Sequence, residues 1–330
     1  MKKLKVFVFL TSVLLLNSAV AQSVFNKNLA HTFSIVAFDE KTGQIGVAVQ
    51  SHWFSVGTLV SWAEPGVGAV ATQSFINASF GPRGLELLKK GKNAKEALEI
   101  LINSDEGRDV RQLAIVDKNG NVAAYTGKKC IAEAGHYEGK HFSVQANMML
   151  KKTVWPAMAK AFQNSKNLPL AERMVAALEA AQREGGDIRG KQSAALIVVS
   201  GKSTGRIWKD KLIDLRVDDS ENPIKEIKRL LMLHRAYDHM NAGDLAVEKN
   251  NPDLALREYG AAEKMFPDNL EMKYWHAVSL ANMGRVQQSL NLFKEVFSKD
   301  ENWRELTKRL VPVGLLNVKK EDLNLIIGVK

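Results

Sequence analysis

Short segments rich in apolar residues, separated by polar turns, recur along the first two thirds of the chain and predict β-strands. From Thr32 the pattern gives a strand over 32–38, the turn DEKTG and a second strand over 44–51. Similar runs predict further strands over 66–73, 111–117, 121–127, 141–147, 192–200 and 211–218. Helical periodicity interrupts the strands twice, and it predicts helix pairs over 81–91 and 93–104 and over 155–165 and 170–186.

The order of these elements indicates a fold class. The Asn-Gly turn at 119–120 is a strong hairpin signal, and strands joined by hairpins form antiparallel sheets. Asn93, followed by Glu96, resembles the capping box of a helix. Because the helices come in pairs, we expect each pair to cover one outer face of stacked sheets. The sequence therefore predicts an α+β fold with a four-layer αββα sandwich over residues 32–221.

The last third of the chain is helical in pattern. Asn222 can cap a helix that has Pro223 at its first position. A repeat with a period of 34 residues follows and resembles the tetratricopeptide repeat, so we predict such helical repeats with a capping helix over 222–311 and a tail over 312–330. The aligned positions pair Gly243 with Ala277, Ala246 with Leu280, Asn250 with Gly284, Ala255 with Ser289, Tyr259 with Phe293, and Ala262 with Val296.

The first residues have the pattern of a secretory signal peptide. Three lysines precede an apolar run over 6–16, and small residues follow up to Ala21, which predicts a signal peptide over 1–21. Its removal takes three lysines from the formal charge of +10, leaving +7, and leaves a leader over 22–31. No later stretch approaches the roughly 20 apolar residues of a membrane helix. We therefore expect an exported periplasmic or extracellular chain without stable membrane insertion.

Charge and cysteine content narrow the class further. No basic stripe interleaved with aromatic residues is present, so we expect no nucleic acid partner. The single cysteine, Cys130, forbids an intrachain disulfide, and its spacing from His136 leaves a thiol hydrolase as a weaker hypothesis. No metal is expected, because the histidines lack zinc-site spacing. No cofactor is expected either, and the sequence contains no phosphate-binding glycine loop followed by Lys-Ser/Thr. We expect these histidines, which include His31, at the surface or at sheet edges. A homo-oligomer is compatible with the sequence.

Thr32 begins the first predicted strand and invites a catalytic interpretation. A threonine hydroxyl is a poor nucleophile unless a base accepts its proton. The free α-amino group of the same residue, with a pKa of about 7.7 to 8.0, can be that base. Only a chain that begins at Thr32 has this amine, so a cut after His31 is required. The alternative is that Thr32 simply begins a strand, where β-branched residues are common.

Four separated segments carry a family resemblance. They are HTFSIVAFDEKTGQIGVAVQS, GVGAVATQSFINASFGPRGLELL, YTGKKCIAEAGHYEGKHFSVQAN, and RGKQSAALIVVS with LIDLRVDD, in that order within residues 31–234. In sequence and order they resemble the bacterial and archaeal family known as domain of unknown function 1028. The resemblance implies an N-terminal-nucleophile-hydrolase-like αββα sandwich. The chain departs from the family pattern at Phe80, where Tyr is common, at Ala146, where Gly is usual, and in the residues ahead of Thr32.

Under this resemblance, several polar residues become candidates for the site. The freed amine of Thr32 would act as its base, amide side chains would supply oxyanion donors or bind substrate, and a histidine would orient substrate or shuttle a proton. The catalytic candidates are Thr32, Gln73, Asn77, His136 and Asn147. The candidates for binding substrate charges are Arg83, Asp214 and Arg216, although the last two alternate on one strand face and could pair with each other instead.

Three functions remain open from the sequence. The leading hypothesis is an exported amide hydrolase of the N-terminal-nucleophile type, acting on a peptide or small amide, whose helical repeats recruit a protein partner or gate access. The alternative is a non-catalytic periplasmic binding or scaffold protein that uses the repeats. The weakest is the thiol hydrolase that uses Cys130.

Overall fold

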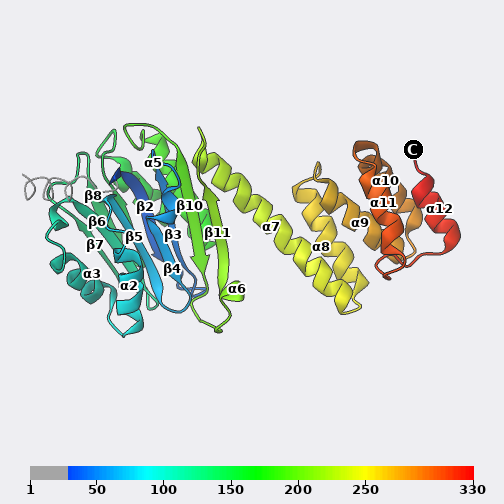
Figure 1. Cartoon of the computed structure of the whole chain (residues 1–330), viewed down its shortest axis with the longest axis horizontal. Coiled ribbons are helices and arrows are strands. Elements are labelled where there is room, and N and C mark those ends of the chain that lie inside the picture. The colour runs from blue at the N-terminus through cyan, green and yellow to red at the C-terminus, as the bar shows by residue number, and fades with distance from the viewer. Residues whose placement is uncertain (1–28) are drawn as a thin grey trace, which may run out of the picture. The chain divides into compact units, whose positions relative to one another are not determined.

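The structure, a computed structural model, describes residues 29–330 (Figure 1). The predicted signal peptide, 1–21, and residues 22–28 of the predicted leader lie outside the described residues. The chain divides into two compact units, the first ending at Lys228 and the second covering Arg229–Lys330.

The first unit contains two antiparallel sheets. In spatial order, sheet A consists of β1 (Leu29–Ala30), β5 (Gly68–Phe75), β6 (Arg111–Asp117) and β7 (Val122–Thr126), and β4 (Ser61–Glu64) also pairs with β5. Sheet B consists of β11 (Lys211–Val217), β10 (Ser193–Val199), β3 (Ile45–Ser51), β2 (Thr32–Phe38), β9 (Phe142–Ala146) and β8 (Gly135–Gly139).

Helices cover both sheets. On sheet A, α2 packs against β5, and α3 packs against β6 and β7; on sheet B, α5 packs against β2 and β3, and α4 packs against β9. The first unit is therefore layered as helices, sheet, sheet and helices (Figure 1). The helices are α2 (Phe80–Lys89), α3 (Ala94–Asn103), α4 (Val154–Asn164), α5 (Leu170–Arg183) and α6 (Ile207–Asp210), with short 3-10 turns η1 (Val56–Thr58) and η2 (Arg108–Val110).

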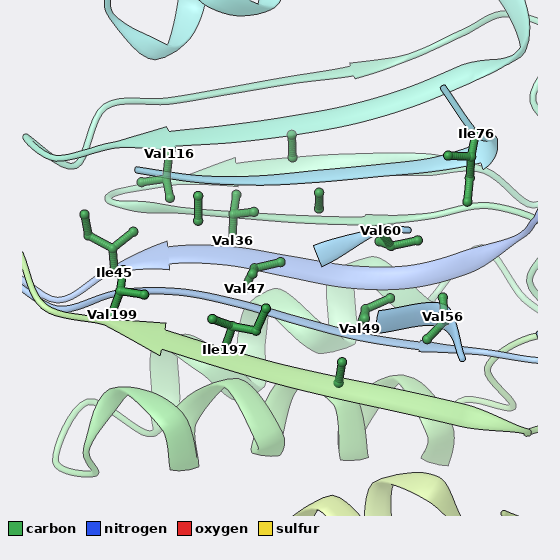
Figure 2. Packing of buried hydrophobic residues seen from close by; sticks show 14 residues of the cluster. Val36, Ile45, Val47, Val49, Val56, Val60, Ile76, Val116, Ile197 and Val199 are labelled. Carbon is green, nitrogen blue, oxygen red and sulfur yellow. The ribbon is translucent and has the colours of Figure 1, made fainter. Parts of the chain in front are cut away.

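An apolar core fills the space between the two sheets. Figure 2 shows Val36 and Val47 of sheet B among the same cluster of side chains as Val116 of sheet A. Sheet A contributes mainly small residues, such as Ala71 and Ala114, which allow the sheets to approach closely. Complete burial of each valine contributes about 1.5 to 3 kcal/mol to folding, so this core is a principal source of stability.

The α+β class and the antiparallel sheets are confirmed as predicted. Strands β2 and β6 have the predicted bounds, and the strands that the prediction missed are β1, β4 and β8. The reason is visible in β8, whose sequence GHYEG lies at a sheet edge with three exposed residues and has no apolar alternation. Edge strands of this kind leave no periodic signal, because only one face and one neighbour constrain them.

The second unit is entirely helical within the part that the structure describes. Consecutive helices pack on each other, α8 against α9 and α9 against α10. Gly243 is needed in α7, because a Cβ at this position would lie 2.5 Å from the ring of Tyr259. The predicted tail, 312–330, in fact contains a helix whose Ile326 is fully buried. The helices are α7 (Pro223–Glu248), α8 (Pro252–Met265), α9 (Leu270–Asn282), α10 (Val286–Lys299), α11 (Asn302–Leu310) and α12 (Lys320–Gly328).

Within residues 29–330, none of the helices combines the length and the apolar character that crossing a bilayer requires.

The capping box at the start of α3 generates a test of the local fold. The Asn93 side chain accepts from the Glu96 backbone N–H at 3.0 Å, and the Glu96 carboxylate accepts from the Asn93 N–H at 2.9 Å. Replacing Asn93 by Ala should lower the free energy of unfolding by about 1 kcal/mol. Urea unfolding measures the change, and amide hydrogen exchange locates it in α3. Lys95→Ala, at an exposed position of the same helix, is the matched control, and equal effects of the two substitutions would contradict the role of the cap.

Candidate active site around Thr32

Thr32 lies at the start of a strand in the middle of sheet B. It is fully buried, with 0% of its surface exposed. Strand β2 pairs with β3 on one side, where Thr32 faces Ser51, and with β9 on the other. Because two neighbours fix β2, the backbone of Thr32 has a defined position, as a nucleophile requires.

Three donors hold the carbonyl oxygen of Thr32. The Gln73 Nε2 donates to it at 3.0 Å from sheet A, and the backbone N–H of Asn147 donates at 3.1 Å. The Asn147 Nδ2 lies further away, at 3.5 Å. The structure therefore brings Gln73 and Asn147 to Thr32, but their N–H groups bind its own carbonyl rather than the position ahead of it.

Gln112 completes this buried cluster and fixes the orientation of the amides. Its Nε2 donates to the backbone oxygen of Ala146 at 2.9 Å, so its Oε1 must accept, and it does so from Gln73 at 2.7 Å and Asn147 at 2.9 Å. These bonds identify the side-chain nitrogen of Asn147 as the atom that faces Gln112. The other side-chain atom, Oδ1, is therefore an oxygen and can only accept hydrogen bonds. Unpaired amides at this depth would each cost about 1 to 3 kcal/mol, which explains why the cluster is complete.

His136 lies at the outer end of the same cluster. Gln112 donates to Thr126 Oγ1 at 2.8 Å, and Thr126 Oγ1 lies 2.8 Å from His136 Nδ1. His136 is thus connected to Thr32 through amide groups, which hold hydrogen bonds but do not release protons near neutral pH. The arrangement suits an orienting role for His136 better than proton transfer.

The carbonyl oxygen of His31, directly ahead of Thr32, is bound by two further donors. Ser51 Oγ donates to it at 2.7 Å and Arg189 Nη2 at 2.9 Å. Asp187 holds the guanidinium in place with bonds of 3.0 Å to Nε and 2.7 Å to Nη2. A hydroxyl and a cation therefore converge on the oxygen of the one peptide bond whose cleavage would free the Thr32 amine.

The His31 side chain is enclosed, in contrast to the expected surface or sheet-edge position. It is 1% exposed, its Nδ1 lies 2.7 Å from Asn147 Oδ1, and its ring meets the Phe75 ring edge-on at 5.5 Å. Burial lowers the pKa of His31 below its ordinary value of 6.5. His31 is therefore neutral near pH 7, with its Nδ1–H donating to Asn147.

Two of the five non-glycine residues that have a left-handed backbone in the described part of the chain flank the cluster. Ser74 follows Gln73 with φ of 72°, and Met148 follows Asn147 with φ of 58°. Residues other than glycine in this left-handed region cost about 1 to 3 kcal/mol each and gather at functional sites. Both strained positions adjoin a residue that binds the Thr32 carbonyl, which supports a functional interpretation of the cluster.

The contacts described for Asn77 and Arg83 lie outside this cluster. Asn77 Oδ1 accepts from Ser79 in the turn before α2, at 2.7 Å from its Oγ. Arg83 is exposed on α2 and donates to Ser104 Oγ at 2.9 Å.

Asp214 and Arg216 lie on β11, separated from β2 by β10 and β3. They form the structural pair that the sequence left open, with Arg216 Nε donating to Asp214 at 3.1 Å, and Lys211 binds the same carboxylate at 2.8 Å.

The Cys130 thiol gains no support as a nucleophile. Burial raises its pKa, and its Sγ donates to the backbone oxygen of Arg111 at 3.3 Å. His136, its proposed partner, is hydrogen-bonded to Thr126. A raised pKa keeps the thiol protonated, which is the opposite of what a thiolate mechanism needs.

Three residues of the site, Ser51, Asp187 and Arg189, are not among the candidates predicted from the sequence. A signal for Ser51 was present, because closing the predicted hairpin with Phe38 opposite Ile45 places Thr32 opposite Ser51. Asp187 and Arg189 lie in the segment between α5 and β10, where a charged pair gives no sign of burial. Their role depends on the fold bringing this segment to β2, which no local pattern reveals.

The buried His31 predicts a pH dependence for the chain that retains the residues ahead of Thr32. Its pKa is lowered in the folded chain, so the stability it contributes is present above about pH 6.5 and is lost as the pH falls below that value. The melting temperature should therefore fall more steeply between pH 7.5 and 5.5 than in a His31→Gln variant, whose side chain cannot titrate. Parallel curves for the two proteins would contradict this prediction.

Comparison with known proteins relates the sandwich to a protein family. The model of the family described as "Family of unknown function (DUF1028)" matches residues 32–227. A crystal structure of a DUF1028 protein from Silicibacter pomeroyi is 31% identical, with a TM-score of 0.54, over 61% of this chain and 88% of that one.

A structure of Anbu, an ancestral beta-subunit from Yersinia bercovieri, is 14% identical with a TM-score of 0.31 over 60% of this chain and 92% of that one, too weak a likeness to argue from. No curated protein matches the chain. The family match spans more than half of the sequence, and the chain therefore belongs to the DUF1028 family of unknown function.

Proposed function

We propose that this protein is an exported amide hydrolase of the N-terminal-nucleophile type, with Thr32 as the nucleophile once the His31–Thr32 bond is broken. One observation carries the proposal: Ser51 and Arg189 converge on the carbonyl oxygen directly ahead of Thr32. Donors fixed at such an oxygen stabilise the negative charge of a tetrahedral intermediate. In many acyl-transfer enzymes this stabilisation is the largest single contribution to the rate enhancement.

The layering of the first unit supports the same reaction class. Two facing antiparallel sheets lie between helical layers, and Thr32 begins a central strand of one sheet. This arrangement supports the N-terminal-nucleophile-hydrolase-like sandwich that the resemblance implies. One fold can carry many unrelated activities, so the proposed reaction depends on the donors around Thr32.

The first reaction would free the Thr32 amine. Thr32 Oγ1 attacks the carbonyl carbon of His31, a step that closes a five-membered ring. The carbon–nitrogen bond then breaks, and the hydroxyl proton moves to the departing nitrogen, which becomes the amine of Thr32. Water hydrolyses the resulting ester, so that His31 leaves as a carboxylic acid and Thr32 Oγ1 regains its proton.

Each later turnover would follow the same path with an external amide. The freed amine accepts the Oγ1 proton during attack and delivers it to the leaving amine, because its pKa of about 7.7 to 8.0 suits both steps. Ser51 and Arg189 bind the oxyanion, while Gln73 and Asn147 keep Thr32 in place through its carbonyl. Water completes the cycle by hydrolysing the acyl ester.

The helical unit would bind a protein partner. Its period of 34 residues, with Gly243 packed against Tyr259, supports a tetratricopeptide-like module that recruits a protein partner. The signal-peptide pattern at residues 1–21 supports export to the periplasm or beyond.

A non-catalytic binding protein is the second candidate. The observation that favours it is the complete burial of Thr32 while His31 remains attached. A chain that keeps this bond has no amine at Thr32 and no access to its hydroxyl.

A chain produced with an initiator methionine directly ahead of Thr32, whose removal exposes the threonine, tests hydrolysis without the earlier cut. N-acetyl tripeptides joined to aminomethylcoumarin, which vary in the residue next to the coumarin, serve as probes. We expect Thr32-dependent release that Thr32→Ser retains and Thr32→Ala lowers by at least about a hundredfold. Thr42→Ala, in an exposed turn, is the matched control. Release that is no faster than that of Thr32→Ala across all the probes would exclude the hydrolase and favour the binding protein.

The earlier cut has its own test in a chain that begins at Gln22. Its intact mass should fall by residues 22–31 with a rate constant that is independent of protein concentration, since the reaction is intramolecular. Arg189→Met and Ser51→Ala should slow it by about 10²- to 10³-fold each, and Arg183→Met, on the exposed end of α5, should not. Cleavage that persists in Thr32→Val, or that accelerates with protein concentration, would show that another protease makes the cut.

A further inference from the structure

Leu29–His31 are the described residues directly ahead of Thr32, and the carbonyl oxygen of His31 accepts from Ser51 and Arg189. We infer that Leu29–His31 occupies the acyl half of this site, and that the site takes extended peptides with histidine on the carbonyl side of the cleaved bond. This inference rests on the proposed function and adds the substrate class to it.

Cleavage of the His31–Thr32 bond and hydrolysis of an external amide pass through the same kind of ester. Attack of Thr32 Oγ1 on His31 gives an ester between the threonine oxygen and the carboxyl group of a peptide ending in histidine. Attack on an external amide gives an ester of the same kind, with the acyl part of the substrate in place of Leu29–His31. Both esters share the donors Ser51 and Arg189 at the carbonyl, so both acyl groups extend from the same point.

The backbone of the acyl group is recognised by strand addition. Leu29 pairs with Phe75 and Ala30 with Ser74, antiparallel, along one edge of β5. Strand β4 occupies the same edge only as far as Ala71. Removal of β1 would therefore leave a short stretch of β5 with main-chain groups available, and an extended peptide binds such an edge through main-chain hydrogen bonds whatever its sequence.

The side chain next to the cleaved bond is read more selectively. Asn147 Oδ1 must be an acceptor, because Asn147 Nδ2 donates to Gln112. The group opposite it must therefore donate, as His31 Nδ1 does at 2.7 Å. The Phe75 ring stands edge-on to the imidazole at 5.5 Å, which favours a flat ring over a branched chain.

An aliphatic residue at this position would leave the Asn147 oxygen buried without a donor. Sites built to hydrogen-bond a substrate N–H reject analogues that lack it much more strongly than apolar pockets reject a change in size. The described environment therefore selects a ring that carries an N–H donor, and among the common residues histidine has the size and shape already accommodated here.

The test compares two probes on the chain that begins at Thr32. These are N-acetyl-Leu-Ala-His and N-acetyl-Leu-Ala-Leu, each joined to aminomethylcoumarin. We expect kcat/KM to be at least about tenfold higher for the histidine probe. Equal values, or a preference for leucine, would overturn the inference while leaving the hydrolase intact. Absence of Thr32-dependent release from every probe would overturn the hydrolase and this inference together.

Three variants test whether the preference for histidine depends on Phe75. Phe75→Leu should lower the ratio of the two kcat/KM values several-fold. Phe38 forms a comparable edge-on pair with His141 at 5.6 Å, at the opposite end of β2, so Phe38→Leu is the matched control and should leave the ratio unchanged. Arg189→Lys should lower kcat for both probes and preserve their ratio, because it acts at the carbonyl. A ratio that follows Phe38 or Arg189 instead of Phe75 would contradict the assigned subsite.

Discussion

The hydrogen bond from Gln73 to the carbonyl oxygen of Thr32 joins the two sheets at the point where the candidate chemistry lies. Gln73 belongs to sheet A and Thr32 to sheet B, so the contact fixes the sheets relative to each other as well as the threonine. Because the contact is buried, every polar group of these amides needs a hydrogen-bond partner. Gln112 Oε1 provides one by accepting from both Gln73 Nε2 and Asn147 Nδ2. The position of Thr32 therefore depends on a polar cluster, while the apolar core between the sheets is a principal source of stability.

This cluster divides the work around Thr32 between two groups of residues. Amides bind the carbonyl behind the nucleophile and hold it still. Ser51 and Arg189 bind the carbonyl ahead of it, where negative charge would develop during attack. The separation explains why the predicted oxyanion donors Gln73 and Asn147 lie at the site but face the strand itself, and why a serine and a loop arginine take the donor role in our proposal.

The sequence predicted the fold much better than the donors of the site. Strand β2 has the predicted bounds because it is a short, mostly apolar run that is buried along nearly its whole length and ends at a polar turn. The cap at Asn93 follows from a local four-residue pattern. The amides Gln73 and Asn147 were anticipated only under the family resemblance, which made them candidates for oxyanion donors or substrate binding. Arg189 was not, because its approach to His31 depends on a segment 158 residues away along the chain. A contact between residues so far apart in sequence depends on the tertiary structure, and local patterns such as periodicity and capping do not reveal it.

The proposed role of Thr32 depends on which residue begins the mature, active protein. Intact mass and N-terminal sequencing of the protein isolated from its native compartment would determine that residue directly. Our account predicts a chain that begins at Thr32. Fully active protein that begins at Gln22, or at any other residue ahead of Thr32, would contradict the role of the threonine amine.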